Sequence, residues 1–165
     1  THGRQPFDPG RKIRLISSSW SPNLNKGAPV YKWLEDQLDW ERFDYTFVGN
    51  SPILFNHIHM IPALISSELA NTLRQHDIFI TASKFESCSN SIIEALNCGL
   101  PVIYIQSGSN GEIVKQAGLG FHDQNQIPGL LDQLMEDYEA YQANISLPSI
   151  AEVADLYLDA MGVDS

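Results

Sequence analysis

Short apolar runs alternate along this chain with segments whose apolar residues recur at helical spacing. The apolar runs predict buried strands at 12–18, 45–50, 77–83 and 100–107, with shorter strands within 57–64 and near 119–121. The amphipathic segments predict helices at 29–38, 66–76, 89–98, 128–142 and from Pro148 to about Met161. We find no internal repeat that would predict a solenoid or an array.

Strands that alternate with helices through short loops are typical of a parallel sheet covered on both faces. We therefore expect an α/β fold, a Rossmann-like doubly wound parallel sheet. Ligands of such sheets bind beyond the carboxyl ends of the strands, where the strand order reverses. The loops expected there are rich in Ser, Asn and Gly, which allow close approach to an anion, and they cover 17–27, 49–52, 83–90 and 106–112.

Composition narrows the class of protein. The chain has 165 residues, 43% of them hydrophobic, which suits one globular domain. Lys and Arg number 10 against 20 Asp and Glu, and the formal net charge of −10 argues against nucleic-acid or anionic-membrane binding. No apolar run reaches the ~18 residues of a membrane span. Cys88 and Cys98 lack zinc-like spacing, which indicates free thiols in a reducing compartment.

Two glutamates eight positions apart flank a predicted helix start. Ser87 to Asn90 lie between Glu86 and Glu94, and Glu94 falls on the polar stripe of the helix. Each feature has an ordinary explanation, because Ser91 and Glu94 fit a capping box and Glu86 fits a solvated loop. Together they predict free backbone N–H groups that bind a phosphate, with a carboxylate on either side for sugar or ribose hydroxyls. The combination favours a nucleotide-sugar site.

The segment FESCSNSIIEALNCGLPVI resembles the E-x7-E segment of retaining glycosyltransferases of the family-4 type, the glycosyl transferases group 1. Three further motifs resemble the same family in the same order: NKG at 25–27, HDIFITAS at 76–83 and GSNGEIVKQAGLGF at 108–121. Such enzymes have the GT-B fold of two Rossmann-like domains, and the chain resembles only the C-terminal, donor-binding half. The resemblance implies an interdomain linker remnant at 1–11, the donor-binding domain at 12–145, and a C-terminal helix at 146–165 that packs toward the N-terminal domain.

The resemblance also implies a role for each site residue. Glu86 would hold hydroxyls of the donor sugar, and Lys26 would neutralise the diphosphate as charge builds on the departing nucleotide. Glu94 would hold the ribose hydroxyls. The diphosphate would bind backbone N–H groups at Ser87, Cys88, Ser89 and Asn90. The base would lie beside Ile61, Pro62, Ala63 and Leu64. We expect neither a metal nor a cofactor.

Five further positions are weaker candidates: Ser19, Trp20, Asn50, Lys84 and Glu112. Trp20 lies in a site loop, but like Trp33 and Trp40 it is more typical of core or interface packing. Lys84 is typical of a solvent-facing lysine. Glu112 could meet a sugar hydroxyl or favour the start of a helix through its dipole. The histidines lack the partners of a metal site.

One departure from the family leaves an alternative open. Family members often carry an arginine about five positions before the lysine, and this chain has Ser21 there. A non-catalytic nucleotide-binding or interaction module on the same fold would explain that difference. A receiver domain would need an acidic cluster after its first strand, where this chain has SSSWSP, and a phosphorylase would need a pyridoxal lysine, for which we find no convincing candidate.

We therefore expect the donor-binding half of a retaining hexosyltransferase. It would transfer a hexosyl group from a nucleotide diphosphate sugar to a polysaccharide, lipid or protein glycan, and would be inactive without its N-terminal acceptor-binding half. The expected partners are the donor and that N-terminal domain, and not nucleic acid. The expected location is the cytoplasm, with any membrane association supplied by the other half.

Overall fold

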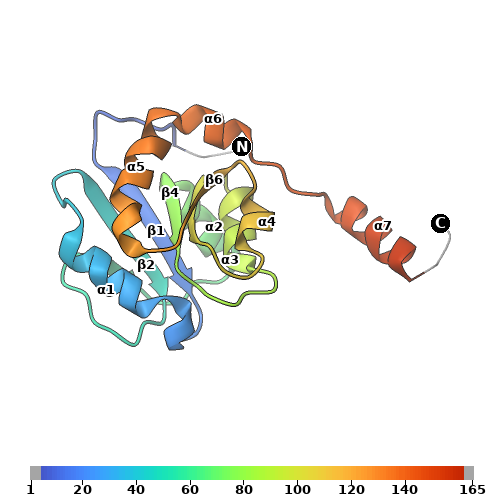
Figure 1. Ribbon diagram of the computed structural model, residues 1–165, viewed down its shortest axis with the longest axis horizontal. Helices are drawn as coiled ribbons and strands as arrows, with labels where there is room; N and C mark the ends of the chain where they lie inside the picture. The colour runs from blue at the N-terminus through green and yellow to red at the C-terminus, as the bar shows by residue number, and fades with distance from the viewer. Residues whose placement is uncertain (1–4, 162–165) are drawn as a thin grey trace.

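The structure is a computed structural model and describes residues 5–161, in which six parallel strands form one sheet. The strands are β1 (Ile13–Ser19), β2 (Phe43–Gly49), β3 (His59–Ile61), β4 (Ile78–Thr81), β5 (Val102–Ile105) and β6 (Gly118–Phe121). Their order is β3-β2-β1-β4-β5-β6 (Figure 1). The chain therefore adds β2 and β3 on one side of β1. It then returns to pair β4 with β1, and adds β5 and β6 beyond β4. The strand order reverses between β1 and β4.

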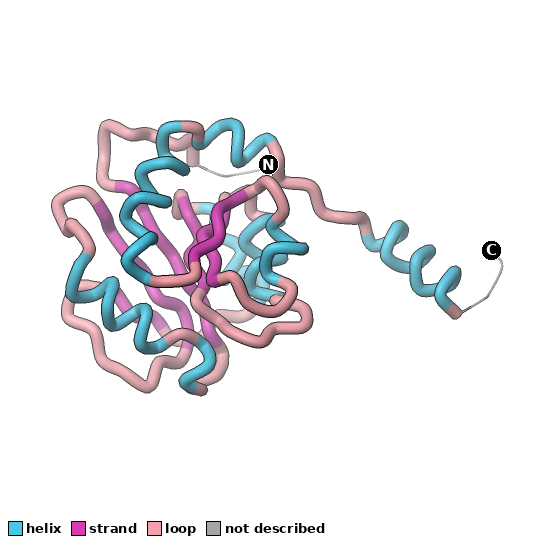
Figure 2. The backbone as a smooth tube through the Cα atoms, viewed as in Figure 1, coloured by secondary structure: helices cyan, strands magenta, loops and turns pink. Residues whose placement is uncertain are grey.

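Helices cover both faces of the sheet. The helices of the described chain are α1 (Ala28–Gln37), α2 (Ser66–Arg74), α3 (Asn90–Asn97), α4 (Asn110–Val114), α5 (Ile127–Glu136), α6 (Tyr138–Ala143) and α7 (Ile150–Ala160), of which α7 does not pack on the sheet. Two short 3₁₀ turns, Leu24–Lys26 and Gln124–Gln126, precede α1 and α5. Helices α1 and α5 lie on one face of the sheet, and α2, α3 and α4 lie on the other (Figure 2); their buried side chains belong to two separate core clusters. The predicted doubly wound α/β fold is confirmed.

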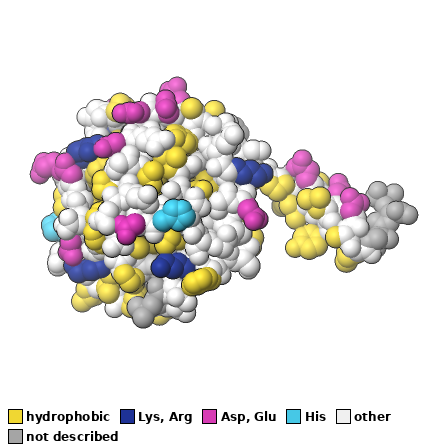
Figure 3. Space-filling model, in the orientation of Figure 1, with side chains coloured by type: hydrophobic (Ala, Val, Ile, Leu, Met, Phe, Trp, Pro, Cys, Tyr) yellow, Lys and Arg dark blue, Asp and Glu magenta, His cyan; other side chains and the backbone are white. Residues whose placement is uncertain are grey.

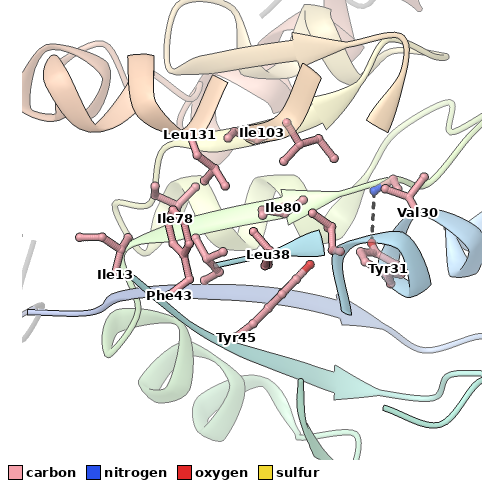
Figure 4. Close-up of a cluster of buried hydrophobic side chains, with 14 of the residues drawn as sticks. Ile13, Val30, Tyr31, Leu38, Phe43, Tyr45, Ile78, Ile80, Ile103 and Leu131 are labelled. Carbon is pink, nitrogen blue, oxygen red and sulfur yellow. Dashed lines mark hydrogen bonds between the residues drawn. The ribbon is translucent and has the colours of Figure 1, made fainter. Parts of the chain in front are cut away.

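The alternating strand side chains divide the core into two clusters. In β1, Leu15 belongs to the cluster under α1 and α5, and Ile16 belongs to the one under α2 and α3. The first cluster also includes Ile78, Ile80 and Leu131 (Figure 4). Each fully buried Leu or Ile contributes roughly 1.5–3 kcal/mol relative to its exposed state. This two-sided burial holds the carboxyl ends of β1 and β4 side by side.

The helix predicted at 128–142 is wrong in one respect, because it is two helices. The chain turns at Asp137, whose backbone (φ −116°, ψ 32°) is not helical, and α6 follows. Tyr138 explains the turn: its hydroxyl donates to the Asp77 carbonyl at 2.7 Å, and its ring stacks on Phe7 at 3.9 Å. Both partners are distant in sequence, so helical periodicity alone could not reveal the break.

The described part of the predicted linker lies on the domain. Arg11 donates two hydrogen bonds to the buried carboxylate of Asp77, at 2.8 and 2.9 Å, and Arg14 donates three, one from its backbone N–H and two from its guanidinium. Burial raises the pKa of Asp77, but the hydrogen bonds from both arginines outweigh it and leave that pKa below its ordinary value. Residues 1–4 of the linker call lie outside the described residues.

Helix α7 extends away from the domain (Figure 1) and has no buried residue. It begins two residues after the predicted Pro148 and is shorter than the helix expected at 146–165, of which residues 162–165 lie outside the described residues. A capping box at Ser149 and Glu152 starts it. Hydrophobic side chains are exposed along this arm (Figure 3), among them Ile150, Leu156 and Tyr157. Its packing toward an N-terminal domain stays a prediction. Within residues 5–161, no helix combines the length and apolarity needed to cross a bilayer.

Candidate active site

A pocket of about 220 Å³ lies at the carboxyl ends of β1 and β4, where the strand order reverses. Its walls come from the loop after β1, from Lys26 in the 3₁₀ turn, from Tyr31 of α1 and from the segment between β4 and α3. A larger hollow of about 780 Å³ lies at the amino ends of β1 and β2, but its Arg11 and Arg42 are already paired with Asp77 and Asp132. Doubly wound folds bind ligands at the first of these positions, which is therefore the candidate site.

Lys26 and Glu86 meet in this pocket across 60 positions of sequence. The Lys26 ammonium donates to Glu86 Oε1, and the Ser83 hydroxyl donates to the same oxygen. Burial raises the pKa of Glu86, but the hydrogen bonds from Lys26 and Ser83 and the charge of Lys26 outweigh it, so the pKa lies below its ordinary value. Glu86 is therefore ionised at neutral pH and paired with a cation.

The loop after β5 holds the backbone of Glu86 in place. Ser109 N donates to the Glu86 carbonyl at 2.9 Å, and Phe85 N donates to the Ser107 hydroxyl at 3.0 Å. Gly108 has φ +58°, and a Cβ there would lie 2.2 Å from the Glu86 carbonyl oxygen. Phe85 itself has φ +60°, which is strained for a bulky side chain. Contacts from the loop after β5 therefore hold a strained residue just before the carboxylate.

The start of α3 presents backbone N–H groups to the same pocket. Ser89 is the N-cap residue, and no side-chain hydrogen bond caps the helix. Within the described part of the chain, the amides of Asn90, Ser91 and Ile92 have no hydrogen-bond acceptor. Such amides, with the helix dipole behind them, attract an anion. The capping-box explanation is wrong, because Ser91 lies inside the helix.

Glu94 lies one turn further along α3 and faces a different hollow. This groove of about 190 Å³ between α2 and α3 is lined by Glu94, Ser66, Ala70 and Arg74, among others. Among residues 5–161 the Glu94 carboxylate has no hydrogen bond or ion pair, and burial raises its pKa. Glu94 and the Ser/Asn cluster thus line different hollows, and the expectation that they serve one donor site stays a prediction. The groove lies on the side of the sheet that α2 covers.

The other candidates are divided between the pocket and its surroundings. Ser19, Cys88, Ser89 and Asn90 line the pocket, and the Cys88 thiol is free and exposed. Ser87 is exposed next to them. The segment 61–64 follows β3 and does not line this pocket, so Ile61, Pro62, Ala63 and Leu64 are not brought to Glu86. Asn50 lies after β2, where its backbone N–H donates to the Ser19 carbonyl at 2.8 Å.

Trp20 lines the pocket and is 57% exposed, so it does not pack in the core, and its packing at an interface stays a prediction. Trp33 and Trp40 do pack against the core, as predicted. Lys84 is exposed and does not line the pocket, which agrees with a solvent-facing lysine. Glu112 is exposed in the first turn of α4, where it favours the helix dipole.

Six residues that line the pocket were not among the predicted site residues: Ser18, Ser21 and Ser83, which lie in the loops expected there, and Tyr31, Thr81 and Ser91. The position of Ser83 at the end of β4, three residues before Glu86, was a usable signal. Tyr31 gave none, because its spacing in α1 is that of a core residue. Its hydroxyl accepts a hydrogen bond from Ala82 N at 3.2 Å.

Lys26 is the only cation among the described residues that line the pocket. Ser21 stands where the family often has an arginine, and no other Lys or Arg replaces it there. In residues 5–161 we also find no cluster of His, Cys, Asp and Glu side chains arranged to hold a metal ion. Most of the positive potential at this site therefore comes from one ammonium and the N-terminus of α3.

A doubly wound sheet with an anion-receptive helix start at the reversal of strand order defines a Rossmann-like ligand-binding domain. The fold is that of one domain of the GT-B glycosyltransferases. The chain belongs to the family described as glycosyl transferases group 1, which it matches over residues 53–146, more than half of its length.

Relatives agree with this assignment. A sucrose synthase of Acidithiobacillus caldus is 28% identical over 63% of this chain and 15% of its own length. The Anabaena protein HepE, solved in complex with UDP and glucose, aligns with 92% of this chain and 48% of its own, with a TM-score of 0.71 and 16% identity. The catalytic domain of starch synthase IV from Arabidopsis thaliana, bound to ADP and acarbose, aligns with 96% of this chain and 38% of its own, with a TM-score of 0.71 and 14% identity. The chain thus spans less than half the length of each of these relatives.

Proposed function

We propose that this chain is the donor-binding half of a retaining glycosyltransferase that transfers a hexosyl group from a nucleotide diphosphate sugar. The observation that carries the proposal is the pairing of Lys26 with Glu86 beside the unpaired amides that start α3. An ammonium and a helix N-terminus suit a diphosphate, and a carboxylate suits sugar hydroxyls. Family membership and relatives solved with UDP or ADP support the same ligand class.

The residues of the site would divide the donor between them. The amides of Asn90, Ser91 and Ile92 would bind the diphosphate together with Lys26. Glu86 would then exchange Lys26 for hydroxyls of the hexose. The unpaired carboxylate of Glu94 would accept hydrogen bonds from the ribose hydroxyls, which would relieve the cost of its burial. The segment 61–64, which leads into α2 near that groove, would meet the base.

Transfer would proceed without a metal or a cofactor. As the glycosidic bond breaks, negative charge grows on the diphosphate, and Lys26 with the α3 dipole would stabilise it. We assign no protein nucleophile, since the departing phosphate can take the proton of the acceptor. The acceptor, a polysaccharide, lipid or protein glycan, would bind to an N-terminal domain. This chain alone would therefore bind donor without turning it over.

Isothermal titration calorimetry of the 165-residue chain with UDP, GDP, ADP and their glucose or mannose conjugates tests the proposal. Saturable binding of one nucleotide is expected, and Glu94→Ala should weaken it about 10- to 100-fold, as expected for lost hydrogen bonds to a charged group. Glu112→Ala is the matched control, because that carboxylate is exposed outside the pocket. Absence of binding by a folded sample would refute the proposal.

A non-catalytic nucleotide-binding module is the second candidate, and the single cation of the pocket favours it. A diphosphate bound by one ammonium would be held more weakly than one bound by two. Donor turnover by a parent protein that contains both domains would exclude this candidate. Nucleotide binding without turnover by such a protein would support it.

A further inference from the structure

Trp20 is an exposed aromatic residue on the wall of a pocket that is otherwise polar. Of the two aromatic residues that line it, Tyr31 is 2% exposed and Trp20 is 57% exposed. The indole of Trp20 is therefore accessible to a ligand in the pocket. Its neighbours on the pocket wall are serines, Lys26 and Glu86. The pocket therefore combines one accessible apolar surface with a few polar groups, as small-molecule sites do.

The backbone that carries Trp20 is fixed by hydrogen bonds. The Asn50 side chain donates to the Trp20 carbonyl at 2.9 Å, and the Ser19 hydroxyl donates to the Ser21 carbonyl at 2.9 Å. Gly49 has φ +112°, and a Cβ there would lie 2.0 Å from the carbonyl oxygen of Ser19, so the end of β2 packs directly against the end of β1, the residue before Trp20. An indole on a fixed backbone has only two torsions to order when it contacts a ligand.

The two faces of the sheet decide which part of a donor would reach Trp20. Glu94 lies in the groove between α2 and α3, on one face. Trp20 and Lys26 lie in the connection from β1 to α1, and α1 covers the other face of the sheet (Figure 1). A donor with its ribose at Glu94 and its diphosphate at the start of α3 would direct its distal group toward Lys26, Glu86 and Trp20.

We propose that the Trp20 indole stacks on the pyranose ring of the donor. This assignment rests on the proposed function. A hexose has C–H faces that suit an aromatic ring and hydroxyl edges that suit a carboxylate, so Trp20 and Glu86 would bind complementary parts of one sugar. Trp20 is then a specificity-determining residue that distinguishes a nucleotide sugar from the free nucleoside diphosphate.

Calorimetry on the full chain with UDP, UDP-glucose, ADP and ADP-glucose tests this assignment. In the wild type the sugar conjugate should bind more tightly than its nucleoside diphosphate. Trp20→Ala should weaken the conjugate about tenfold and leave the nucleoside diphosphate unchanged, and Trp20→Phe should restore most of the loss. Leu54→Ala is the matched control, because Leu54 is 91% exposed and does not line the pocket.

Fluorescence gives a second readout. The double variant Trp33→Phe and Trp40→Phe leaves Trp20 as the only indole, since the chain has 3 tryptophans. Its emission should shift to shorter wavelength with the sugar conjugate and much less with the nucleoside diphosphate, because stacking removes the ring from water.

Each other outcome overturns the assignment. Equal weakening of both ligands in Trp20→Ala would mean that the residue only shapes the phosphate site. An unchanged preference for the sugar conjugate, or no preference in the wild type, would mean that Trp20 does not touch the sugar. Failure of every nucleotide to bind the wild type would refute the proposed function and this assignment together. Binding of the nucleoside diphosphate with no gain from the sugar would refute this assignment alone, so the two failures are distinguishable.

Discussion

Substitution of Gly108 tests how the carboxylate of Glu86 is positioned. In Gly108→Ala the new Cβ would lie 2.2 Å from the Glu86 carbonyl oxygen and 2.9 Å from Glu86 N. Both neighbours are backbone atoms, so no side chain can rotate away. The loop after β5 must then shift, and the hydrogen bond from Ser109 N to the Glu86 carbonyl, 2.9 Å long, should lengthen or break.

The magnitude follows from two costs. A φ of +58° costs a residue with a Cβ roughly 1–2 kcal/mol relative to glycine. Steric overlap with the fixed backbone should add about 1–2 kcal/mol, within the range for overpacked sites. The free energy of unfolding should therefore fall by about 2–4 kcal/mol. For a domain of this size, that is a Tm lower by roughly 5–15 °C.

Gly129→Ala provides a control with the opposite sign. A Cβ at Gly129, in α5, would meet nothing within 4 Å. Alanine is the better helix former, so this variant should be as stable as the wild type or up to about 1 kcal/mol more stable. Urea unfolding measures both variants, and calorimetry should show weaker sugar-nucleotide binding for Gly108→Ala alone. A Gly108→Ala variant with wild-type stability would refute the steric reasoning.

Three further predictions concern buried charge and α7. Glu94→Gln should raise the free energy of unfolding at pH 7 by up to about 0.5 kcal/mol, because burial raises the pKa of that carboxyl and penalises its charged form. The gain should disappear in urea titrations below pH 4.5, where the wild-type carboxyl is also neutral. A loss of stability at both pH values would contradict this. Asp77→Asn should cost about 1–3 kcal/mol at pH 7, because it removes the charge that pairs with the partly exposed Arg11 and Arg14. Because the pKa of Asp77 is lowered, the stabilisation by its carboxylate is present above about pH 3.8 and is lost as the pH falls through the lower native pKa. The difference in free energy of unfolding between the variant and the wild type should therefore shrink in acid. A difference that stays constant would argue against an ionic cause. Truncation after Pro148 should change the Tm by less than about 2 °C, since α7 buries no residue on the domain, and a larger fall in a thermal melt would mean that α7 packs on it.

The sequence predicts the sheet well because local patterns specify its elements. Apolar runs locate the strands, and Gly99, with φ +81°, ends α3 as expected of a glycine after a helix. What it does not predict depends on distant contacts. The break at Asp137 depends on Phe7 and on the Asp77 carbonyl, more than 50 positions away, so no local periodicity contains it.

The site shows the same limit. The glutamate segment is recognisable from its residues, because two glutamates and the small polar residues between them occur together at the start of a buried helix. The groove that Glu94 faces is not recognisable from the sequence, because it depends on where α2 lies. Ile92, Ala95 and Leu96 occupy the core face of α3, and Glu94 lines a groove on the α2 side. The pairing of Lys26 with Glu86 also depends on the adjacency of β1 and β4, which only the strand order supplies.

That pairing bears on how the site would distinguish its ligands. In the free chain, the single cation and the single carboxylate among the described residues that line the pocket satisfy each other, in a protein of net charge −10. A diphosphate that takes Lys26 would leave Glu86 ionised, half-buried and bonded only to Ser83, which costs free energy. Hydroxyls of a sugar on the same ligand would replace the lost donor. A nucleoside diphosphate would therefore bear the cost of breaking the pair, whereas a nucleotide sugar would offset it, so the ion pair itself favours the complete donor over its product.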